Sequence, residues 1–357
     1  MSRELDSELG FSEDAIADCL AREGLLSLEL EFTRACNLRC TYCYSSAGAA
    51  LERELSLDEL CAVVAQAKKL GARRIILLGG GEPFLYPAVR EIIRHIHALG
   101  LDQAVFTNGV CLDEALCRFL FAHRVTVAVK QNSFIPAVQD ELAGVRGAYA
   151  GIQRGLQLLR GAGYPDAEHR FCVQTIICRA NRAEIGAMWT WAREHGITPY
   201  FEALTDQGRA REHPDLTLSA AELQEAFQEL AEIDERRFGI SWNARPPIAG
   251  FTCRRHLYSC LVNAQGFVQP CPGVEISVGN VREKPLGAIL RESRVIRDLR
   301  GIYRQIDPAC RACRFAGTCY GCRGNAYQAT GSYLAADPGC WLKSTVAGEA
   351  CACGGGE

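Results

Sequence analysis

Residues 26–44 read LSLELEFTRACNLRCTYCY, and this stretch decides the fold. Its first seven residues alternate apolar and polar side chains, which predicts a β-strand. Three cysteines follow in the loop behind it, Cys36, Cys40 and Cys43, in the spacing CxxxCxxC. A loop anchored on a rigid strand can aim several side chains at one point. The next cysteine, Cys61, lies in an amphipathic helical pattern, so the trio lacks the second pair that a zinc site normally needs.

Three thiolates suit an iron–sulfur cubane. Each iron of a 4Fe–4S cluster prefers one thiolate, so three cysteines would leave the fourth iron open. The spacing resembles that of the radical S-adenosylmethionine (SAM) enzymes, whose motif carries an aromatic residue just before its last cysteine. Tyr42 stands at that position, and the resemblance implies that its ring lies beside the adenine. It also implies that SAM binds the open iron and yields a 5′-deoxyadenosyl radical.

Two further segments carry the same resemblance. The strand-like run 73–78 ends in GGGEP, at residues 79–83, which is similar to the family's GGEP motif. The resemblance implies that Gly80 and Gly81 let the backbone approach SAM, and that Glu82 accepts hydrogen bonds from its ammonium group. The strand near 103–107 ends in Thr-Asn-Gly, which again is similar to the family and places Asn108 at the cofactor. A plain strand-to-helix turn and an Asn-Gly turn remain the alternatives.

Strand-like and helical patterns alternate between residues 25 and 205. Alternation of this kind predicts a parallel sheet covered by helices, that is, the α/β class. Helices are expected at 56–70 and 87–99. The resemblance implies a partial (β/α)6 barrel of the TIM type, with the ligand at the carboxyl ends of the strands. The expected strands lie near 26–32, 74–79, 103–107, 124–130, 170–178 and 198–204.

Later strand ends indicate further cofactor contacts. Residues 130–133 follow the fourth strand, and the resemblance implies that Ser133 or Asn132 meets the ribose of SAM. A glycine-arginine turn follows the sixth strand, where Arg209 could bind the SAM carboxylate with two hydrogen bonds. The alternatives are a solvated turn and a surface salt bridge. No residue is indicated as the catalytic acid or base.

The last third of the chain is rich in cysteine. Cys253 is followed by twelve residues, a glycine, four residues and Cys271, and two CxxC pairs come later. This pattern resembles the SPASM extension of radical SAM enzymes, which holds two auxiliary 4Fe–4S clusters. One cluster would take Cys253, Cys260, Cys271 and Cys322, and the other Cys310, Cys313, Cys319 and Cys340. The chain departs from the family in having two residues, not three, between Cys319 and Cys322. Cys260 lies outside the seven-cysteine motif of the extension.

A disulfide-rich domain and a zinc domain are the alternatives for this region. A disulfide-rich domain favours an oxidising compartment, whereas the N-terminus lacks a basic-then-apolar signal segment. The remaining cysteines fall in helical or strand patterns and are expected to be small core residues. Cys351 and Cys353, in the glycine-rich tail, are either a flexible thiol pair or without a role.

Composition narrows the class of protein. The chain has 357 residues with a net charge of −3, which gives no electrostatic reason to expect binding to nucleic acid or to a membrane. Its nineteen cysteines suggest a reducing cytoplasm and metal ligation. We expect four parts: an N-terminal helical extension (1–24), the barrel (25–245), the SPASM domain (246–345) and a flexible tail (346–357).

The resemblance implies oxidative modification or cross-linking of a peptide or protein, similar to sulfatase-maturating and peptide-modifying enzymes. A low-potential donor such as flavodoxin or ferredoxin would supply the electron. The segment before the first strand is too short for the N-terminal peptide-binding module that many relatives carry. Oxidation of a small molecule, such as an aminosugar or a cofactor precursor, is the alternative. A non-catalytic iron–sulfur electron-transfer protein is the alternative from another class.

Overall fold

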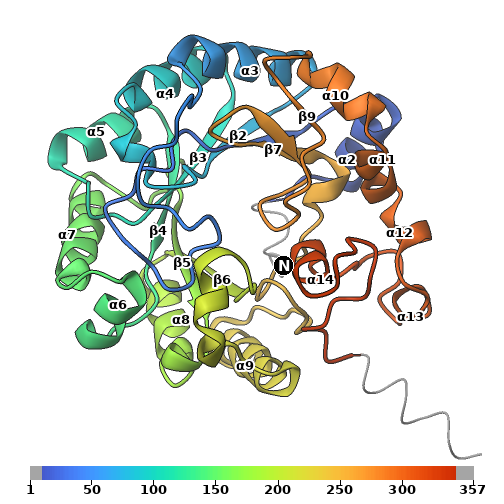
Figure 1. The fold of residues 1–357 in the computed structure, drawn as a ribbon. Coiled ribbons are helices and arrows are strands. Elements are labelled where there is room, and N and C mark those ends of the chain that lie inside the picture. The colour runs from blue at the N-terminus through green and yellow to red at the C-terminus, as the bar shows by residue number, and fades with distance from the viewer. Residues whose placement is uncertain (1–9, 343–357) are drawn as a thin grey trace, which may run out of the picture.

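One sheet of nine strands is the frame of the molecule (Figure 1). The structure, a computed structural model, describes residues 10–342. The strand order is β6-β5-β4-β3-β2-β1-β7-β8-β9. The strands are β1 (Ser27–Leu30), β2 (Arg74–Leu77), β3 (Asp102–Thr107), β4 (Val125–Lys130), β5 (Phe171–Ile177), β6 (Thr198–Ala203), β7 (Ser259–Val262), β8 (Phe267–Gln269) and β9 (Gly279–Asn280). The first six pair in parallel in chain order, so the predicted strands and partial barrel are confirmed.

Helices surround the curved sheet (Figure 1). Those before and between the first strands are α2 (Glu13–Ala21), α3 (Leu57–Lys69), α4 (Val89–Ala98), α5 (Glu114–Ala122), α6 (Pro136–Ala143), α7 (Ala148–Gly161), α8 (Ile185–Glu194) and α9 (Ala220–Ile233). The later ones are α10 (Leu286–Glu292), α11 (Arg294–Arg300), α12 (Ile302–Gln305), α13 (Pro308–Arg311) and α14 (Arg323–Thr330). The two helices expected at 56–70 and 87–99 are therefore confirmed as α3 and α4.

Local sequence explains where α3 begins and which face it buries. The Ser56 hydroxyl accepts from the Glu59 backbone N–H, and the Glu59 carboxylate accepts from the Ser56 N–H, so both groups form a capping box. Leu60, Val63 and Val64 recur at helical spacing and are buried. They belong to the main core, which fills the space between the sheet and its helices.

Strand β1 separates that core from the barrel interior. Leu28 and Leu30 are fully buried and pack in the main core. Ser27 and Glu29 alternate with them and line a cavity inside the barrel. Because successive strand side chains point to opposite faces, the LSLE pattern itself puts polar groups inside.

The sheet continues into the C-terminal third of the chain. Strand β7 pairs in parallel with β1, and β8 and β9 follow as antiparallel neighbours. The sequence pattern did not predict these three short strands, which have only two to four residues each. The barrel sheet and the cysteine-rich region thus share one continuous hydrogen-bonded frame. The domain boundary expected at 245/246 stays a prediction.

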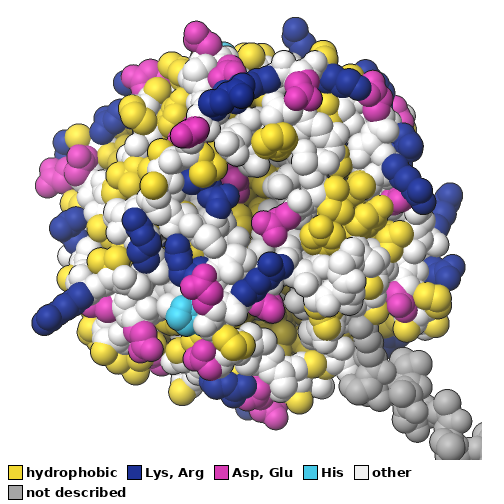
Figure 2. All heavy atoms as spheres, in the orientation of Figure 1, with side chains coloured by type: hydrophobic (Ala, Val, Ile, Leu, Met, Phe, Trp, Pro, Cys, Tyr) yellow, Lys and Arg dark blue, Asp and Glu magenta, His cyan; other side chains and the backbone are white. Residues whose placement is uncertain are grey.

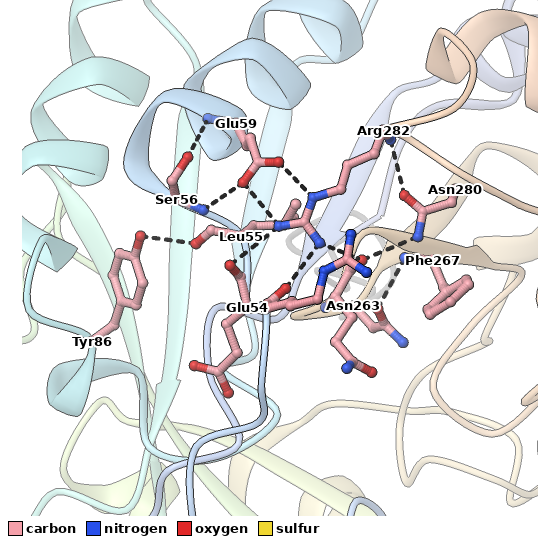
Figure 3. Close-up of polar contacts among 11 residues, drawn as sticks. Glu54, Leu55, Ser56, Glu59, Tyr86, Asn263, Phe267, Asn280 and Arg282 are labelled. Carbon is pink, nitrogen blue, oxygen red and sulfur yellow. Dashed lines mark hydrogen bonds and ion pairs between the residues drawn. The ribbon is translucent and has the colours of Figure 1, made fainter.

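Polar contacts join this C-terminal hairpin to the barrel (Figure 3). The Arg282 Nε donates to the Glu59 carboxylate at 2.5 Å, and its other nitrogens donate to the carbonyls of Arg53 and Glu54. The Glu54 carboxylate in turn accepts from the backbone N–H of Arg34 at 2.8 Å. Because Arg34 precedes the first cysteine by two residues, the hairpin helps to fix the loop that carries the motif.

No helix within residues 10–342 combines the length and the apolar character that crossing a bilayer requires. Figure 2 shows basic and acidic side chains interspersed over the face that it presents, and one sign of charge does not dominate there.

Candidate active site

A cavity of about 740 Å³ occupies the barrel interior. Its lining includes two groups of cysteines that lie far apart in the sequence. The first group is Cys36, Cys40 and Cys43; the second is Cys253, Cys271 and Cys322. Polar side chains from several barrel strands line the cavity as well, so both groups share one space.

Main-chain contacts hold the first cysteine loop. The backbone N–H groups of Arg39 and Thr41 donate to carbonyls at the end of α6, both at 3.0 Å. Leu38 is buried beside α6 and α7. The Cys36 sulfur accepts from the Leu38 N–H, and the Cys43 sulfur accepts from a backbone N–H four residues on, both at 3.4 Å. Hydrogen bonds to cluster sulfurs tune the reduction potential, so these two contacts would act on any cluster that the loop holds.

Arg209 clamps the same loop. Its two terminal nitrogens donate to the carbonyls of Cys40 and Ala47, each at 2.8 Å, and its backbone N–H donates to the Cys43 carbonyl at 2.9 Å. An irregular loop leaves carbonyls without strand or helix partners, and the guanidinium satisfies them. These contacts use one N–H of each terminal nitrogen, and the contact expected between Arg209 and the SAM carboxylate stays a prediction.

The glycine-rich segment forms the wall beside the loop. A Cβ on Gly81 would lie 2.1 Å from the Ala35 carbonyl oxygen, so only glycine fits there. Glu82 is buried and accepts from the Thr107 hydroxyl at 2.7 Å and the Asn108 N–H at 2.8 Å. Burial raises the pKa of Glu82 to about 7, although these hydrogen bonds act to lower it. Gly80, Gly81, Glu82 and Asn108 all line the cavity, as the sequence predicted for a cofactor wall.

Tyr42 also lines the cavity. Its hydroxyl accepts from the Asn132 side chain at 2.6 Å, and the Lys130 ammonium lies 5.4 Å from the ring centroid. Asn132 thus positions the aromatic residue of the motif. The Ser133 hydroxyl is buried and donates to Glu184 at 2.6 Å, and the ribose contact expected of Ser133 stays a prediction. The start of α8 competes for that hydroxyl, which the sequence pattern could not show.

The ion pair between Glu29 and Arg255 inside the barrel was not expected from the sequence. Glu29 of β1 is buried and forms an ion pair with Arg255 at 3.1 Å. Glu202 of β6 accepts from the Gln174 side chain. Burial raises the pKa of Glu29 and lowers that of Lys130. The alternation in residues 27–31 was the available signal, because every second residue there is polar and faces inward.

The C-terminal cysteines fall into two groups. Cys253 and Cys271 are near enough to Cys322 to add to the effect of burial, which raises the pKa of its thiol. Burial raises the pKa of the Cys340 thiol to about 11, and Cys310 and Cys319 are near enough to add to this effect. Cys313 in turn lies close enough to Cys319 to contribute to its raised pKa, after burial. We name the cavity-lining trio Cys253, Cys271 and Cys322 the inner set, and Cys310, Cys313, Cys319 and Cys340 the outer set.

Cys260 belongs to neither set. It lies on β7 opposite Leu28 of β1 and is fully buried in the apolar main core. Its neighbour Ser259 lines the cavity instead. Strand alternation turns its thiol towards the helices, and the ligand role expected of Cys260 stays a prediction.

The grouping of these cysteines also bears on whether the C-terminal region binds zinc or iron–sulfur clusters. Cys319 and Cys322 form one CxxC pair, yet they fall in different sets. Among the described residues, no three His, Cys, Asp or Glu side chains converge closely enough to hold a single metal ion. Zinc would need all its sulfurs at about 2.3 Å from one ion.

Comparisons with known proteins agree with this geometry. The family model described as the Radical SAM superfamily matches residues 30–182, and the SPASM iron-sulfur cluster-binding domain matches residues 253–314. The chain is 30% identical over 339 residues to the PqqA peptide cyclase of Gluconobacter oxydans, covering 89% of this chain and 90% of that protein. This chain belongs to the radical SAM superfamily and carries a SPASM domain.

One further relative in sequence and one solved structure are also similar to this chain. The AdoMet-dependent heme synthase of Methanosarcina barkeri is 28% identical over 342 residues, which cover 87% of this chain and 94% of the relative. The crystal structure of Streptococcus suis SuiB bound to S-adenosylmethionine superposes with a TM-score of 0.69 at 16% identity, covering 89% of this chain and 78% of SuiB. The latter shows that the radical SAM and SPASM fold is shared.

As a radical SAM enzyme, the chain uses SAM and iron–sulfur clusters as cofactors. When bound, they supply a 5′-deoxyadenosyl radical that abstracts a hydrogen atom. The protein's own residues position the reactants and exclude water. Arg209 and the α6 carbonyls hold the first loop in shape, and Gly81 admits close backbone packing. Glu82 is held in place by the hydrogen bonds that it accepts from Thr107 and Asn108.

Proposed function

We propose that this radical SAM enzyme oxidises or cross-links a peptide or protein substrate. One observation carries the proposal: the first cysteine loop and the inner set line the same cavity. A substrate that loses a hydrogen atom there keeps an unpaired electron, and a net oxidation requires that electron to leave. A redox cluster on the inner set would lie at the same cavity to receive it. The similarity to a peptide cyclase supports a peptide substrate.

We propose the following roles for the residues. Cys36, Cys40 and Cys43 hold the SAM-binding cluster, and the inner and outer sets hold one auxiliary cluster each. Tyr42 lies beside the adenine, Glu82 faces the ammonium group of SAM, and Asn108 helps to form the binding wall with Gly80 and Gly81. The buried hydrogen bonds of Tyr42 and Glu82 support these roles, because they fix both side chains before a ligand arrives.

A small-molecule substrate is the second candidate. The similarity to AdoMet-dependent heme synthases over most of both chains favours a heme precursor. The cavity carries Lys130 and the Arg255–Glu29 pair, which could orient acidic groups of such a molecule. Its volume of about 740 Å³ falls within the range usual for small-molecule sites.

SAM cleavage tests the activity itself. The anaerobically reconstituted protein, mixed with SAM and dithionite, is expected to release 5′-deoxyadenosine. The variant Cys36→Ala/Cys40→Ala/Cys43→Ala should keep roughly two-thirds of the iron and release none, because only one of three clusters is lost. A wild-type protein with intact clusters that releases no 5′-deoxyadenosine would instead be a non-catalytic electron-transfer protein.

Isotope transfer separates the two substrate classes. Deuterated short peptides encoded beside the gene are compared with a deuterated tetrapyrrole precursor of heme. The class that moves deuterium into 5′-deoxyadenosine and raises its yield is the substrate class. Transfer from the tetrapyrrole alone would reject the peptide proposal.

We also propose a low-potential donor, flavodoxin or ferredoxin, and a cytoplasmic location. Reductive cleavage of SAM needs one electron from outside the chain. The nineteen cysteines suit a reducing compartment, in which thiols stay available for cluster assembly. Replacing dithionite by reduced flavodoxin or ferredoxin in the cleavage assay tests the donor; cleavage with dithionite alone would count against both proteins.

A further inference from the structure

Two serine hydroxyls at the amino end of the barrel cavity have no hydrogen-bond partner within residues 10–342. Ser27 begins β1 and is 2% exposed, and Ser259 begins β7 and is 6% exposed. Both serines line the cavity, whereas the next residue of each strand, Leu28 or Cys260, packs in the main core. A buried hydroxyl without a partner costs free energy, so these two groups indicate a place for a polar group of a ligand.

Strand pairing brings Arg74 to the same place. Ser27 is the register partner of Ser259 on β7 and of Arg74 on β2. Paired residues on neighbouring strands lie about 5 Å apart and face the same side of the sheet, and Arg74 also lines the cavity. Its guanidinium carbon lies 5.2 Å from the ring centroid of Phe11, a cation–π contact that holds the side chain. Two hydroxyls and one guanidinium therefore occupy adjacent positions in one row.

Positive charge exceeds negative charge at this end of the cavity. Three arginines and two carboxylates line it within three residues of a strand start: Arg74, Arg124, Arg170, Asp102 and Glu168. Arg124 and Glu168 form an ion pair at 2.5 Å, so Arg74 and Arg170 outnumber the remaining carboxylate, Asp102. Burial lowers the pKa of Arg74, and Arg170 adds to this effect while Asp102 opposes it. An anion bound here would relieve the repulsion between the two guanidinium groups.

The cavity changes character between this end and the first cysteine loop. Apolar side chains of β2 and β3, and of the residue after β2, line its middle: Ile76, Leu78, Ala104 and Phe106. The loop begins beyond Thr33, six residues along the chain from Ser27, which corresponds to roughly 20 Å of extended strand. A ligand that reaches from one end to the other therefore needs an anionic end and an apolar body.

We propose that the amino end of the cavity binds a carboxylate of the substrate. The hydroxyls of Ser27 and Ser259 donate to its oxygens, and the guanidinium of Arg74 balances its charge. This inference rests on the proposed function, whose substrate it specifies as an acid with an apolar body. The carboxylate belongs to a small organic acid or to an acidic residue of a peptide, at most about six extended residues from the residue that reacts.

Matched probes test the requirement for a carboxylate. The anaerobically reconstituted protein is titrated calorimetrically with octanoate and octanamide, and with the peptides acetyl-ALALE-amide and acetyl-ALALQ-amide. In at least one pair, the acid is expected to bind ten times more tightly than its amide. The pair with the larger ratio identifies the source of the carboxylate, a small acid or a peptide. Equal affinity of acid and amide in both pairs, or no binding of any probe, would overturn the proposal.

Substitutions locate the subsite. Arg74→Met should bring the ratio of acid to amide affinity close to one, and Ser27→Ala/Ser259→Ala should lower it several-fold. Because the two hydroxyls make no hydrogen bond to the described residues, removing them should not lower the unfolding free energy, unlike the loss of a structural contact. A stable Ser27→Ala/Ser259→Ala protein with the wild-type ratio would overturn the proposal.

Controls at exposed positions complete the design. Ser277→Ala removes a hydroxyl outside the cavity, and Arg118→Met removes an arginine that pairs with Glu114 on α5. Both should keep the wild-type ratio, and a fall in either would show that the ratio does not report this subsite, which would overturn the proposal. Because the titrations need neither SAM nor an electron, their failure is distinct from failure of SAM cleavage.

Discussion

The first cysteine loop and the C-terminal cysteine region bring their thiols together in different ways. The loop places three thiols within eight residues and is held by backbone contacts to α6 and by Arg209. The C-terminal cysteines are spread between residues 253 and 340, and side chains such as Asp337 bring their segments together. A short motif therefore carries its geometry in its spacing, whereas a dispersed ligand set depends on the whole fold.

Removing the clusters should loosen the C-terminal cysteine region much more than the barrel. Within residues 307–319, which carry three outer-set cysteines, the structure buries no side chain. Such a segment has little apolar packing, so metal ligation must supply its order. Chelation of the iron under reducing conditions should speed amide hydrogen exchange there by tenfold or more, with strands β2–β5 unchanged. Equal protection before and after chelation would show that this segment is ordered without metal ligation.

The largest effect of a single substitution is expected beside the first loop. Gly81→Ala would drive a Cβ into the Ala35 carbonyl, and overpacking against backbone should cost about 3 kcal/mol of unfolding free energy. Urea denaturation of the protein without clusters measures it. The matched control is Gly161→Ala at the end of α7, where a Cβ meets open space. The control should change stability by about 1 kcal/mol or less.

Asp337 provides the corresponding test in the C-terminal region. Its carboxylate accepts from the Cys322 N–H, the Asn325 side chain and the Gly339 N–H, all within 2.9 Å. Asp337→Ala leaves these donors unsatisfied and should cost about 2–3 kcal/mol. Hydrogen exchange in α14 should rise, together with loss of auxiliary iron. Asp215→Ala, an exposed control, should change stability by less than about 0.5 kcal/mol.

The first region should also respond to pH through Glu82. Its pKa is raised from 4.5 to about 7 by burial, so folding favours the protonated form. This stabilisation is fully present below pH 4.5 and is lost as pH rises to about 7. Without cofactors, the difference in unfolding free energy between wild type and Glu82→Gln should shift by on the order of 2 kcal/mol over that range. A flat difference would contradict the assignment.

The smallest effect is expected from a conservative change in the clamp. Arg209→Lys keeps the charge but loses the fork that holds two carbonyls, and should cost about 1 kcal/mol. The readout is the rate at which the SAM-binding cluster loses iron to a chelator, which should rise several-fold. Arg236→Lys, in an exposed pair with Glu232, should leave that rate unchanged. An unchanged rate in Arg209→Lys would show that the loop needs no clamp.

Much of the barrel was predictable because its signals are local. Alternation over residues 26–32 predicted β1, and the capping residues around Ser56 predicted α3. Tyr42, Glu82 and Asn108 follow short motifs at strand ends, and they line the cavity as expected. Parallel strands bring their carboxyl ends to one edge, so sequence order was enough to gather these residues.

Three predicted site residues have contacts that a local pattern could not show. Ser133 donates to Glu184, some fifty residues away, and Arg209 reaches the carbonyl of Cys40, far back in the chain. The short strand β7 gave too weak a periodic pattern to be recognised, so the facing of Cys260 was not readable. Which polar group satisfies which partner depends on long-range packing.

The sequence by itself determined the class of chemistry, since thiol spacing within one loop and the motifs at strand ends are properties of contiguous residues. Only the tertiary structure decided which distant cysteines share a site, because their grouping depends on strand pairing. It also placed Cys260 among apolar side chains and left three inner thiols facing the cavity. A strand has two faces, and which one looks inward is fixed only when its neighbours are in place.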